Sequence, residues 1–549
     1  MKPVPSAPPV AEKPPSTASA RKDGSKRLVG PRAFKLLWDA HSISGIVIGL
    51  GLFVIFYAGA FSLYRAELYA WADPAMRSGA TMLTVDEAAA PLFEEAPPGP
   101  GADVIVSYPI RDRTVYWFRY QTAEQDTVEA YVNASTGETL PTQGRSALSD
   151  MLYELHFFGQ GGIWGEVVSG FVSVFMLFAI ASGLLIHLRK LPKDWHTFRP
   201  RAKLRDALAD AHTVLGLVGL PFAAMYAISG AFLALLVILL GPSVLLVFEG
   251  DPEKIDATLA GFEVPPHDPT GEPAVMLPFA AYEDALPSSW DGVATIATVV
   301  VHVWGDAAAI ATVYAESPGT LTGSPRAVLS AATGEVLVAN DPPTATALGG
   351  TTATLTNLHF ASFGGGLVKV LYFVLALATS AVILTGNVLW MLVRRPKDPR
   401  ATPWLHRFLA RLTVGVGCGL VVAVPVLFLT TQVLPIDAPD LRMWEHVALF
   451  GTWILLTFAA FAGPTATAAA RWQLALAGVL SLFVPLASGA LGESWPWTSL
   501  AQGWTGLLIV DAGFALMGVV LVWMAVKMHS DEDRLQREGQ TRKAVANIA

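Results

Sequence analysis

The sequence predicts a helical membrane protein with about eight transmembrane helices and two small α+β domains outside the cytoplasm. The helix–domain–helix unit is duplicated within the chain. Three observations carry this prediction: the apolar composition, a series of long apolar runs, and segments that recur in the same order. Of 549 residues, 53% are hydrophobic and 15% are charged, which is too apolar for an ordinary soluble enzyme.

Eight apolar runs are candidates for membrane crossing. A spanning helix needs about 20 apolar residues, because lipid offers the backbone no hydrogen-bond partner. Long and short connections alternate between the first four runs, and short loops join the last four. The runs are Ile43–Leu63, Ile163–Leu188, Val214–Val247, Leu367–Val393, Leu405–Val433, Val447–Phe461, Leu474–Ala490 and Trp504–Lys527.

The distribution of charge predicts the orientation. Segments 1–40, 189–205 and 394–411 are basic, and basic short loops stay in the cytoplasm. From Glu249 through Asp341, fourteen acidic residues face only two basic ones, so this loop is expected outside. An even number of helices then leaves both termini inside. The net charge of −8 therefore combines acidic segments outside with basic segments in the cytoplasm. This distribution argues against a nucleic-acid partner.

These assignments divide the chain into segments, each with an expected role. The predicted segments are a disordered cytoplasmic tail at 1–32, transmembrane helix 1 at 33–64, an outer domain at 65–150, helix 2 at 151–188, a cytoplasmic loop at 189–208, helix 3 at 209–247, a second outer domain at 248–352, helix 4 at 353–395, four further helices within 404–527, and a cytoplasmic tail at 528–549.

Paired segments reveal the duplication. Asp-Ala-His recurs at His41 and His212, and eighteen residues after each His comes Gly-Ala-Phe. Leu-His-Phe recurs at His156 and His359, followed in register by a Gly-Gly pair. Each outer loop ends in alternating apolar residues around Thr-Gly-Glu, which predicts a β-hairpin. In the first loop, residues 115–118 are expected to form a strand and residues 85–92 a helix. The chain's single cysteine, Cys418, lies in the fifth run, which excludes disulfides and covalently attached haem.

In the order of these motifs, the chain resembles the PepSY-associated transmembrane family over about residues 33–395. Asn133 and Ser330 stand where the family's hairpin usually has Asp. Members include iron-regulated inner-membrane proteins and ferric-siderophore reductases. The resemblance implies PepSY-like outer domains in the periplasm of a bacterial inner-membrane protein. It also implies an oxidoreductase that carries electrons through haem b to a ferric siderophore or related ferric substrate, for iron acquisition.

The duplicated histidines are the candidate site residues. Two neutral imidazoles facing each other across an approximate twofold axis can ligate one haem iron axially. We therefore predict two haems b, with His41 and His212 as the iron ligands near the cytoplasmic surface and His156 and His359 near the outer surface.

Glycines next to these histidines fit the same prediction. Gly45 and Gly216 lie four residues after His41 and His212 on the same helical face, where a missing side chain leaves room for a porphyrin. The Gly-Gly pairs after the second set could serve likewise. The alternative interpretation is that the four histidines only anchor helix ends at the membrane interface.

Other polar residues receive weaker assignments. His187 is a rival partner for His41 or His212, although Trp390 takes its place in the second repeat. Asp511 lies inside the eighth run, where an acidic residue is costly, and either relays protons or faces a wet cavity. The remaining histidines fall in interfacial positions, where anchoring is expected, or in loops and tails, where solvation is expected: His196, His267, His302, His406, His446 and His529.

Other functions remain open from the sequence. No catalytic side chain and no nicotinamide or flavin motif is recognisable, so the electron donor is expected to be a separate cytoplasmic reductase or a membrane quinol. The principal alternative is a non-enzymatic protein whose outer domains bind a peptide or protease, or regulate one. A transporter is a third possibility, because duplicated helix pairs also build permeases.

Overall fold

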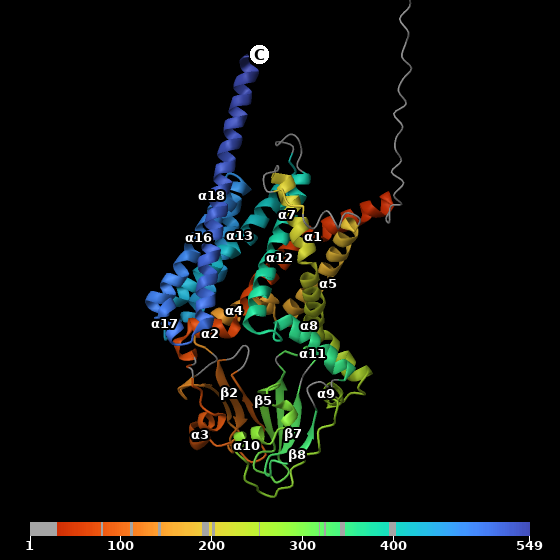
Figure 1. Cartoon of the computed structure of the whole chain (residues 1–549), viewed down its shortest axis with the longest axis vertical. Helices are drawn as coiled ribbons and strands as arrows, with labels where there is room; N and C mark the ends of the chain where they lie inside the picture. The colour runs from red at the N-terminus through yellow and green to blue at the C-terminus, as the bar shows by residue number, and fades with distance from the viewer. Residues whose placement is uncertain are drawn as a thin grey trace, which may run out of the picture.

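The computed structural model describes residues 30–548, except 78, 80, 110–113, 141–143, 189–196, 200–203, 252, 318, 323–324, 341–345 and 395–401. Residues 1–29 of the predicted tail and most of the loop at 189–208 therefore lie outside the described residues, and residues 31 and 32 of that tail are helical. Helices form one bundle with a β-sheet at one end, and the last helix points away from the opposite end (Figure 1).

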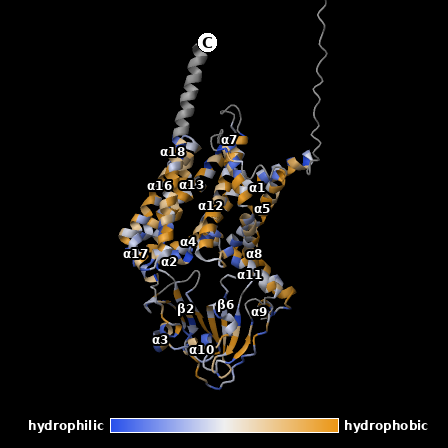
Figure 2. Cartoon of the chain, in the orientation of Figure 1, coloured by the Kyte–Doolittle hydropathy of each residue, from blue (hydrophilic) through white to orange (hydrophobic). Residues whose placement is uncertain are grey.

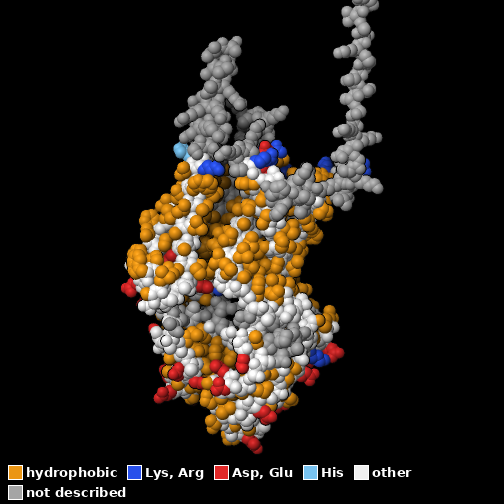
Figure 3. Space-filling view, viewed as in Figure 1, with side chains coloured by type: hydrophobic (Ala, Val, Ile, Leu, Met, Phe, Trp, Pro, Cys, Tyr) orange, Lys and Arg blue, Asp and Glu red, His pale blue; other side chains and the backbone are white. Residues whose placement is uncertain are grey.

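Eight helices in the described part of the chain are long and apolar enough to cross a membrane, as predicted. They form a hydrophobic band (Figure 2). Lys and Arg gather at the end of this band remote from the sheet, and Asp and Glu gather over the sheet (Figure 3). The candidate spans are Pro31–Ser62, Gly159–His187, Leu220–Leu246, Gly365–Val393, Trp404–Val433, Leu441–Ala462, Ala466–Leu491 and Thr505–His529.

Several helices extend beyond the apolar runs. Helix α1 (Pro31–Ser62) begins well before His41, with Pro at its first position, where a missing N–H costs nothing. The third predicted helix is divided into α7 (Leu204–Val218) and α8 (Leu220–Leu246). Helix α18 (Thr505–Ile548) continues through most of the segment predicted as a tail. An apolar run marks only the part of a helix that meets lipid, so polar helical turns escape detection.

The last four spans pack against helices from both repeats. Helix α13 (Trp404–Val433) contacts both α1 and α12 (Gly365–Val393), and α18 contacts the short helix α2 (Arg65–Ala72). An aromatic cluster fills this junction: the Phe61 and Phe428 ring centroids lie 6.2 Å apart, and those of Phe428 and Phe514 lie 4.4 Å apart. The remaining helices here are α14 (Leu441–His446), the π-helical turn Val447–Gly451, α15 (Thr452–Ala462), α16 (Ala466–Leu491) and α17 (Pro496–Ala501).

The two outer domains join in one antiparallel sheet of eight strands. Its order is β4-β3-β2-β1-β5-β6-β7-β8, so β1 and β5 form the seam between the repeats, with Val104 opposite Val301 and Ser107 opposite Thr298. The two domains, expected as separate modules, thus share one sheet. The strands are β1 (Val104–Ser107), β2 (Val115–Gln121), β3 (Thr127–Asn133), β4 (Thr139–Leu140), β5 (Thr295–His302), β6 (Ile310–Glu316), β7 (Arg326–Ser330) and β8 (Val336–Ala339).

Two helices, one from each repeat, complete the core of the sheet. Helix α3 (Val85–Glu95), which confirms the predicted helix, begins with a capping box between Thr84 and Glu87. Asp86 in α3 accepts hydrogen bonds from the backbone N–H of Phe279 and Ala280 at the start of α10 (Phe279–Asp284), at 2.8 and 2.9 Å. Both helices contribute to a single apolar core with the strands. The predicted hairpins are present as β3–β4 and β7–β8.

Two short helices connect the sheet to the membrane spans. Helix α4 (Leu148–His156) precedes α5 (Gly162–His187), and α11 (Ala347–Phe360) precedes α12. Gly162 and Gly365 start the following helices with φ of 58° and 63°, which glycine adopts without strain. The Gly-Gly pairs therefore make the turns into α5 and α12, and that they also leave room for a porphyrin stays a prediction. A small helix α9 (Glu253–Ala260) contacts α11.

Candidate functional site

His41 and His212 meet near the end of the bundle remote from the sheet. Their ring centroids lie 6.2 Å apart, with the planes at 69°. The Nδ1 atom of His41 lies 2.9 Å from the backbone oxygen of Ala179 in α5. The Nδ1 atom of His212 lies 2.9 Å from the backbone oxygen of Val382 in α12. Ala179 and Val382 stand at equivalent positions of the two repeats, so the contact is duplicated along with the histidines.

His156 and His359 form a second pair near the sheet. Their ring centroids lie 5.8 Å apart, with the planes at 44°. The Nδ1 atom of His156 lies 2.7 Å from the backbone oxygen of Ile55. The Nδ1 atom of His359 lies 2.9 Å from the hydroxyl of Ser229. That hydroxyl donates its own proton to the backbone oxygen of Met225, at 2.8 Å, so it accepts a hydrogen bond from the ring.

These hydrogen bonds assign the tautomer of the four rings in their neutral form. Three acceptors are carbonyl oxygens and the fourth is the Ser229 hydroxyl, so the proton of a neutral ring lies on Nδ1 and the lone pair on Nε2, as in metal-bound histidines. Metal–nitrogen bonds of about 2.0–2.1 Å, with about 1.1 Å from nitrogen to ring centre, place two imidazoles on opposite sides of one metal with centroids about 6 Å apart. Both pairs have this spacing, so the predicted partners are together.

Four glycines make room for the imidazole rings. A Cβ atom added to Gly59 would lie 2.5 Å from Nδ1 of His156, and one added to Gly183 or Gly386 would lie 3.0 or 2.9 Å from Cε1 of His41 or His212. A Cβ on Gly230 would be 3.7 Å from His359. The recurrence of these glycines was visible in the sequence, but their contact with the rings was not.

Gly45 and Gly216 take a different position. Both line the cavity around His41 and His212. A Cβ atom added to Gly45 would meet nothing within 4 Å, and one added to Gly216 would meet only Val382 at 3.8 Å. The helix surfaces beside these histidines are therefore open toward the cavity.

The inner cavity has a volume of about 420 Å³ and is lined mainly by apolar side chains. Two buried donors on its wall, Nδ2 of Asn387 and Nε1 of Trp390, have no hydrogen-bond partner in the described part of the chain. Arg205 and Arg394 also line it. A flat apolar macrocycle with carboxylate side chains, which is the chemistry of a haem, fits an apolar cavity of this kind with orphaned donors and cations.

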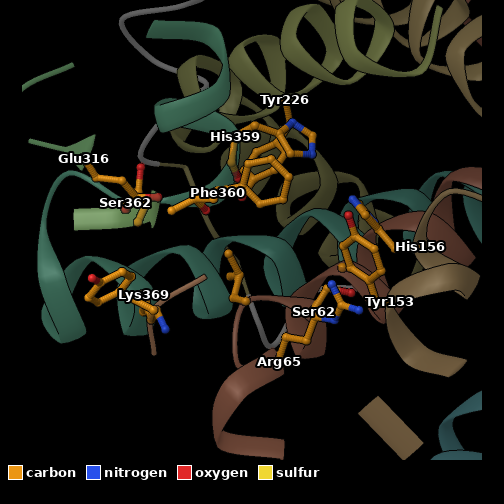
Figure 4. A pocket seen from close by; sticks show the side chains of 15 residues that line it. Ser62, Arg65, Tyr153, His156, Tyr226, Glu316, His359, Phe360, Ser362 and Lys369 are labelled. Carbon is orange, nitrogen blue, oxygen red and sulfur yellow. Dashed lines mark hydrogen bonds between the residues drawn. The ribbon is translucent and has the colours of Figure 1, made fainter. Parts of the chain in front are cut away.

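The outer pair lies between two smaller cavities of about 280 and 150 Å³. The larger cavity extends from the two imidazoles toward the seam of the sheet, where Tyr108 and Thr298 line it. Arg65 and Lys369 also contribute to its wall (Figure 4). Both cations are engaged with acidic residues: Arg65 with Asp150 at 3.1 Å and Lys369 with Glu67 at 3.0 Å.

The inner and outer sites are connected through the bundle. Gly59, which contacts His156, follows His41 by eighteen residues of α1, which is about 27 Å of helix at about 1.5 Å per residue. Leu52 and Met176 line both the inner cavity and the smaller outer one. These two side chains therefore separate the inner cavity from the smaller outer one, between the two histidine pairs.

An aromatic cluster also lies along this interval. The Tyr226 ring centroid is 4.9 Å from that of His359 and 4.7 Å from that of Phe222, and Phe222 is 5.2 Å from Tyr372. Tyr226 further donates a hydrogen bond to the backbone oxygen of His359 at 2.9 Å.

The remaining sequence candidates lie as follows. His187 ends α5 and lines the inner cavity together with His41, His212 and Trp390. Asp511 is buried at 6% exposure. Its carboxylate accepts hydrogen bonds from Nε1 of Trp71 at 2.9 Å and from the hydroxyl of Ser488 at 3.0 Å, so it does not face lipid.

Ser229 and Glu445 also belong to the site and its supports, and neither was predicted. Ser229 replaces Ala58 of the first repeat, and this departure between aligned repeats is the signal that was available. Glu445 is fully buried. It accepts hydrogen bonds from the Ser146 hydroxyl at 2.5 Å, the backbone N–H of Ala147 at 2.6 Å and the Thr431 hydroxyl at 2.7 Å. It thereby anchors the start of α4, the helix that ends at His156.

Comparisons with known proteins agree with the architecture. Residues 38–392 match the family described as the PepSY-associated TM region. The chain is also 27% identical to an uncharacterized protein of Pseudomonas aeruginosa, PA4219, over 407 residues, covering 69% of this chain and 95% of that protein. The matched family region includes both histidine pairs and the whole sheet, and it ends before the last four spans.

Proposed function

On the premise that this chain belongs to the PepSY-associated transmembrane family, we propose that it is a haem b-containing oxidoreductase of the bacterial inner membrane. It passes electrons to a ferric siderophore or related ferric substrate in the periplasm, for iron acquisition. The observation that carries the proposal is the arrangement of the four histidines: two close pairs, each ring hydrogen-bonded through Nδ1.

The protein's part is to hold and insulate two redox groups. Haem b, when bound, supplies one-electron transfer. His41 and His212 would hold the inner group, and His156 and His359 the outer one. A haem held by two imidazoles would favour electron transfer over binding of a further ligand. The apolar walls exclude water from the interval between the sites.

The direction of transfer follows from the charge distribution. The basic end of the bundle is assigned to the cytoplasm and the acidic sheet to the periplasm, with both termini inside. A separate cytoplasmic reductase or a membrane quinol would deliver the electrons to the inner site. The ferric substrate would dock in the outer cavity beneath the sheet seam. One electron converts Fe(III) to Fe(II), which hard oxygen donors hold less tightly, so the metal is released.

The decisive experiment is a reduced-minus-oxidised absorption spectrum of the purified protein, with haem content measured per chain. We expect two haems b in the unchanged protein and one in each of His41→Ala and His156→Ala. The matched control is His446→Ala, an exposed histidine whose Nδ1 also bonds to a backbone oxygen, that of Arg442 at 2.6 Å, but whose ring lies beside Phe450.

Two results would overturn the proposal. A protein purified without any haem spectrum would favour the non-enzymatic alternative, in which the outer domains bind a peptide or protease. Haem that persists at two per chain in both His→Ala variants would show that these residues are not the ligands. The activity itself is then tested in right-side-out membrane vesicles, in which the sheet faces the medium. An electron donor is supplied inside, and reduction of a ferric chelate outside is measured.

A further inference from the structure

Two histidines outside the membrane bundle are brought together at the end of the sheet seam. His302 is the last residue of β5, and His267 lies in the segment before α10. Their ring centroids are 5.1 Å apart, with the planes at 38°. Thr298 of the outer cavity lies four residues before His302, which is about 13 Å along the strand at about 3.3 Å per residue. This pair is therefore separate from the histidines of the proposed haem sites.

The backbone around the pair is fixed by hydrogen bonds. The Asp306 carboxylate accepts from the Thr270 hydroxyl and from the backbone N–H of Gly271, both at 2.7 Å. The backbone N–H of Ala274 donates to the oxygen of Gly305 at 2.9 Å. These contacts hold the segment that carries His267 against the turn that follows His302, so the proximity of the two rings is part of the fold.

The Nδ1 atom of each ring is already engaged. In His302 it lies 3.3 Å from a carboxylate oxygen of Asp103, at the start of β1. In His267 it lies 3.2 Å from the backbone oxygen of Pro265. Both partners are acceptors, so the neutral form of each ring has its proton on Nδ1 and its lone pair on Nε2. A carboxylate or carbonyl bonded to the far nitrogen is the arrangement that orients metal-binding histidines.

The spacing of the rings matches two ligands on adjacent corners of one metal. With metal–nitrogen bonds of about 2.0–2.1 Å and a tetrahedral angle of about 109°, the ring centroids fall about 5 Å apart. That is the distance seen here, and it is shorter than the spacing of about 6 Å expected for imidazoles on opposite sides of a metal, the spacing of the intramembrane pairs.

We infer that His267 and His302 form a binding site for a divalent d-block cation. Imidazole suits Zn²⁺, Fe²⁺, Cu²⁺ and Ni²⁺ among such metals. No group of three or more His, Cys, Asp or Glu side chains placed to hold a metal occurs in the described part of the chain, so water completes the coordination. The His302 side chain is 25% exposed, which leaves the site open to solvent and makes the bound metal exchangeable.

The site gains a specific role if the proposed function holds, and this part of the inference rests on it. Ferrous iron released from a reduced chelate would be a d-block cation in need of softer ligands than the hard oxygen donors it has left. A two-imidazole site on the same outer domain would bind it transiently after release. The binding of Zn²⁺, in contrast, depends on no redox step.

The test is equilibrium dialysis of the untagged, full-length protein after chelator treatment, against Zn²⁺ and, without oxygen, against Fe²⁺. Bound metal is measured by atomic emission. We expect one equivalent bound to the unchanged protein, at least tenfold weaker binding in His267→Ala and His302→Ala, and 10–100-fold weaker binding in Asp103→Asn, as is typical when the orienting partner is lost. His446→Ala is the matched control and should bind as the unchanged protein does.

The outcomes separate this inference from the proposed function. Metal binding that is unchanged in both His267→Ala and His302→Ala, or lost equally in His446→Ala, would overturn the site. The haem spectrum of His267→Ala should equal that of the unchanged protein. Metal binding in a protein that lacks haem would leave the site standing and remove the proposed reductase. Binding of Zn²⁺ without Fe²⁺ would overturn the role in iron release.

Discussion

Replacing Ser229 with alanine tests the outer site while all four proposed iron ligands are kept. The Ser229 hydroxyl lies 2.9 Å from Nδ1 of His359 and is fully buried. Removing it leaves a buried ring N–H without its acceptor, which costs about 1–3 kcal/mol. One factor of ten in affinity corresponds to about 1.4 kcal/mol, so haem affinity at the outer site should fall about 5- to 150-fold. Loss of an orienting partner typically weakens metal binding about 10–100-fold, in agreement.

The matched control for this variant is Ser182→Ala. The Ser182 hydroxyl lies 3.5 Å from Nδ1 of His41, while the backbone oxygen of Ala179 already accepts the hydrogen bond at 2.9 Å. Its removal should therefore leave the inner site unchanged. The same chain thus offers one serine on which a ring depends and one on which it does not.

The assay is a haem titration of the haem-depleted protein, combined with a potentiometric titration of the loaded protein. Ser229→Ala should weaken one binding phase and shift one of two reduction waves, while the other phase and wave report that the fold is intact. The reasoning is refuted if Ser229→Ala binds both haems as the unchanged protein does. A loss of the same size in Ser182→Ala would refute it equally, because the effect would then not depend on the hydrogen bond.

Three further predictions concern the supports of the site and of the sheet. Gly59→Ala should displace His156, since the new Cβ would lie 2.5 Å from its ring, and the variant should bind one haem fewer. The control Gly51→Ala, where the atom nearest to the new Cβ is 3.6 Å away, should keep both haems. Equal haem content in the two variants would contradict this. Glu445→Ala should lower the free energy of unfolding by at least about 2 kcal/mol, because three buried donors lose the carboxylate as acceptor. Thermal unfolding measures this change, and an unchanged midpoint temperature would refute the prediction. Hydrogen bonds, first from the backbone N–H of the turn that follows it, lower the pKa of Asp306 to about 2. The ionised Asp306 carboxylate should therefore stabilise the folded protein fully above about pH 4, and this contribution should be lost as the pH falls toward 2. Asp306→Asn should remove this acid transition from the profile of tryptophan fluorescence against pH. An identical profile in the variant would count against the prediction.

The sequence predicted the helical spans and the facing histidines because both leave local or repeated signals. A spanning helix needs a long apolar run, and the duplication marked His41 with His212 and His156 with His359 as equivalent. Helix 1 was predicted at 33–64 and α1 spans Pro31–Ser62, although its apolar run begins only at Ile43 because the first turns are polar. Helices α4 and α11 were missed because each is too short to give a clear apolar period.

The joined sheet and the contacts around the rings lay beyond the sequence. The apolar β-branched residues of β1 favour a strand but do not say which strand it pairs with, and its partner β5 is about 190 residues away. The proximity of Gly183 to His41 depends on how α5 packs against α1, which no local pattern encodes. The pairing of His267 with His302 likewise depends on hydrogen bonds made by Asp306, so both histidines looked like solvated loop residues.

The seam between β1 and β5 has an evolutionary consequence. An antiparallel pair of strands is self-complementary under a twofold rotation, so a half-length ancestor would expose β1 as a free edge and would close on a second copy of itself. That homodimer would rebuild the whole sheet and bring identical histidines face to face. Fusion of two such copies would leave each half free to change alone, as at Ser229, which stands where the first half has Ala58.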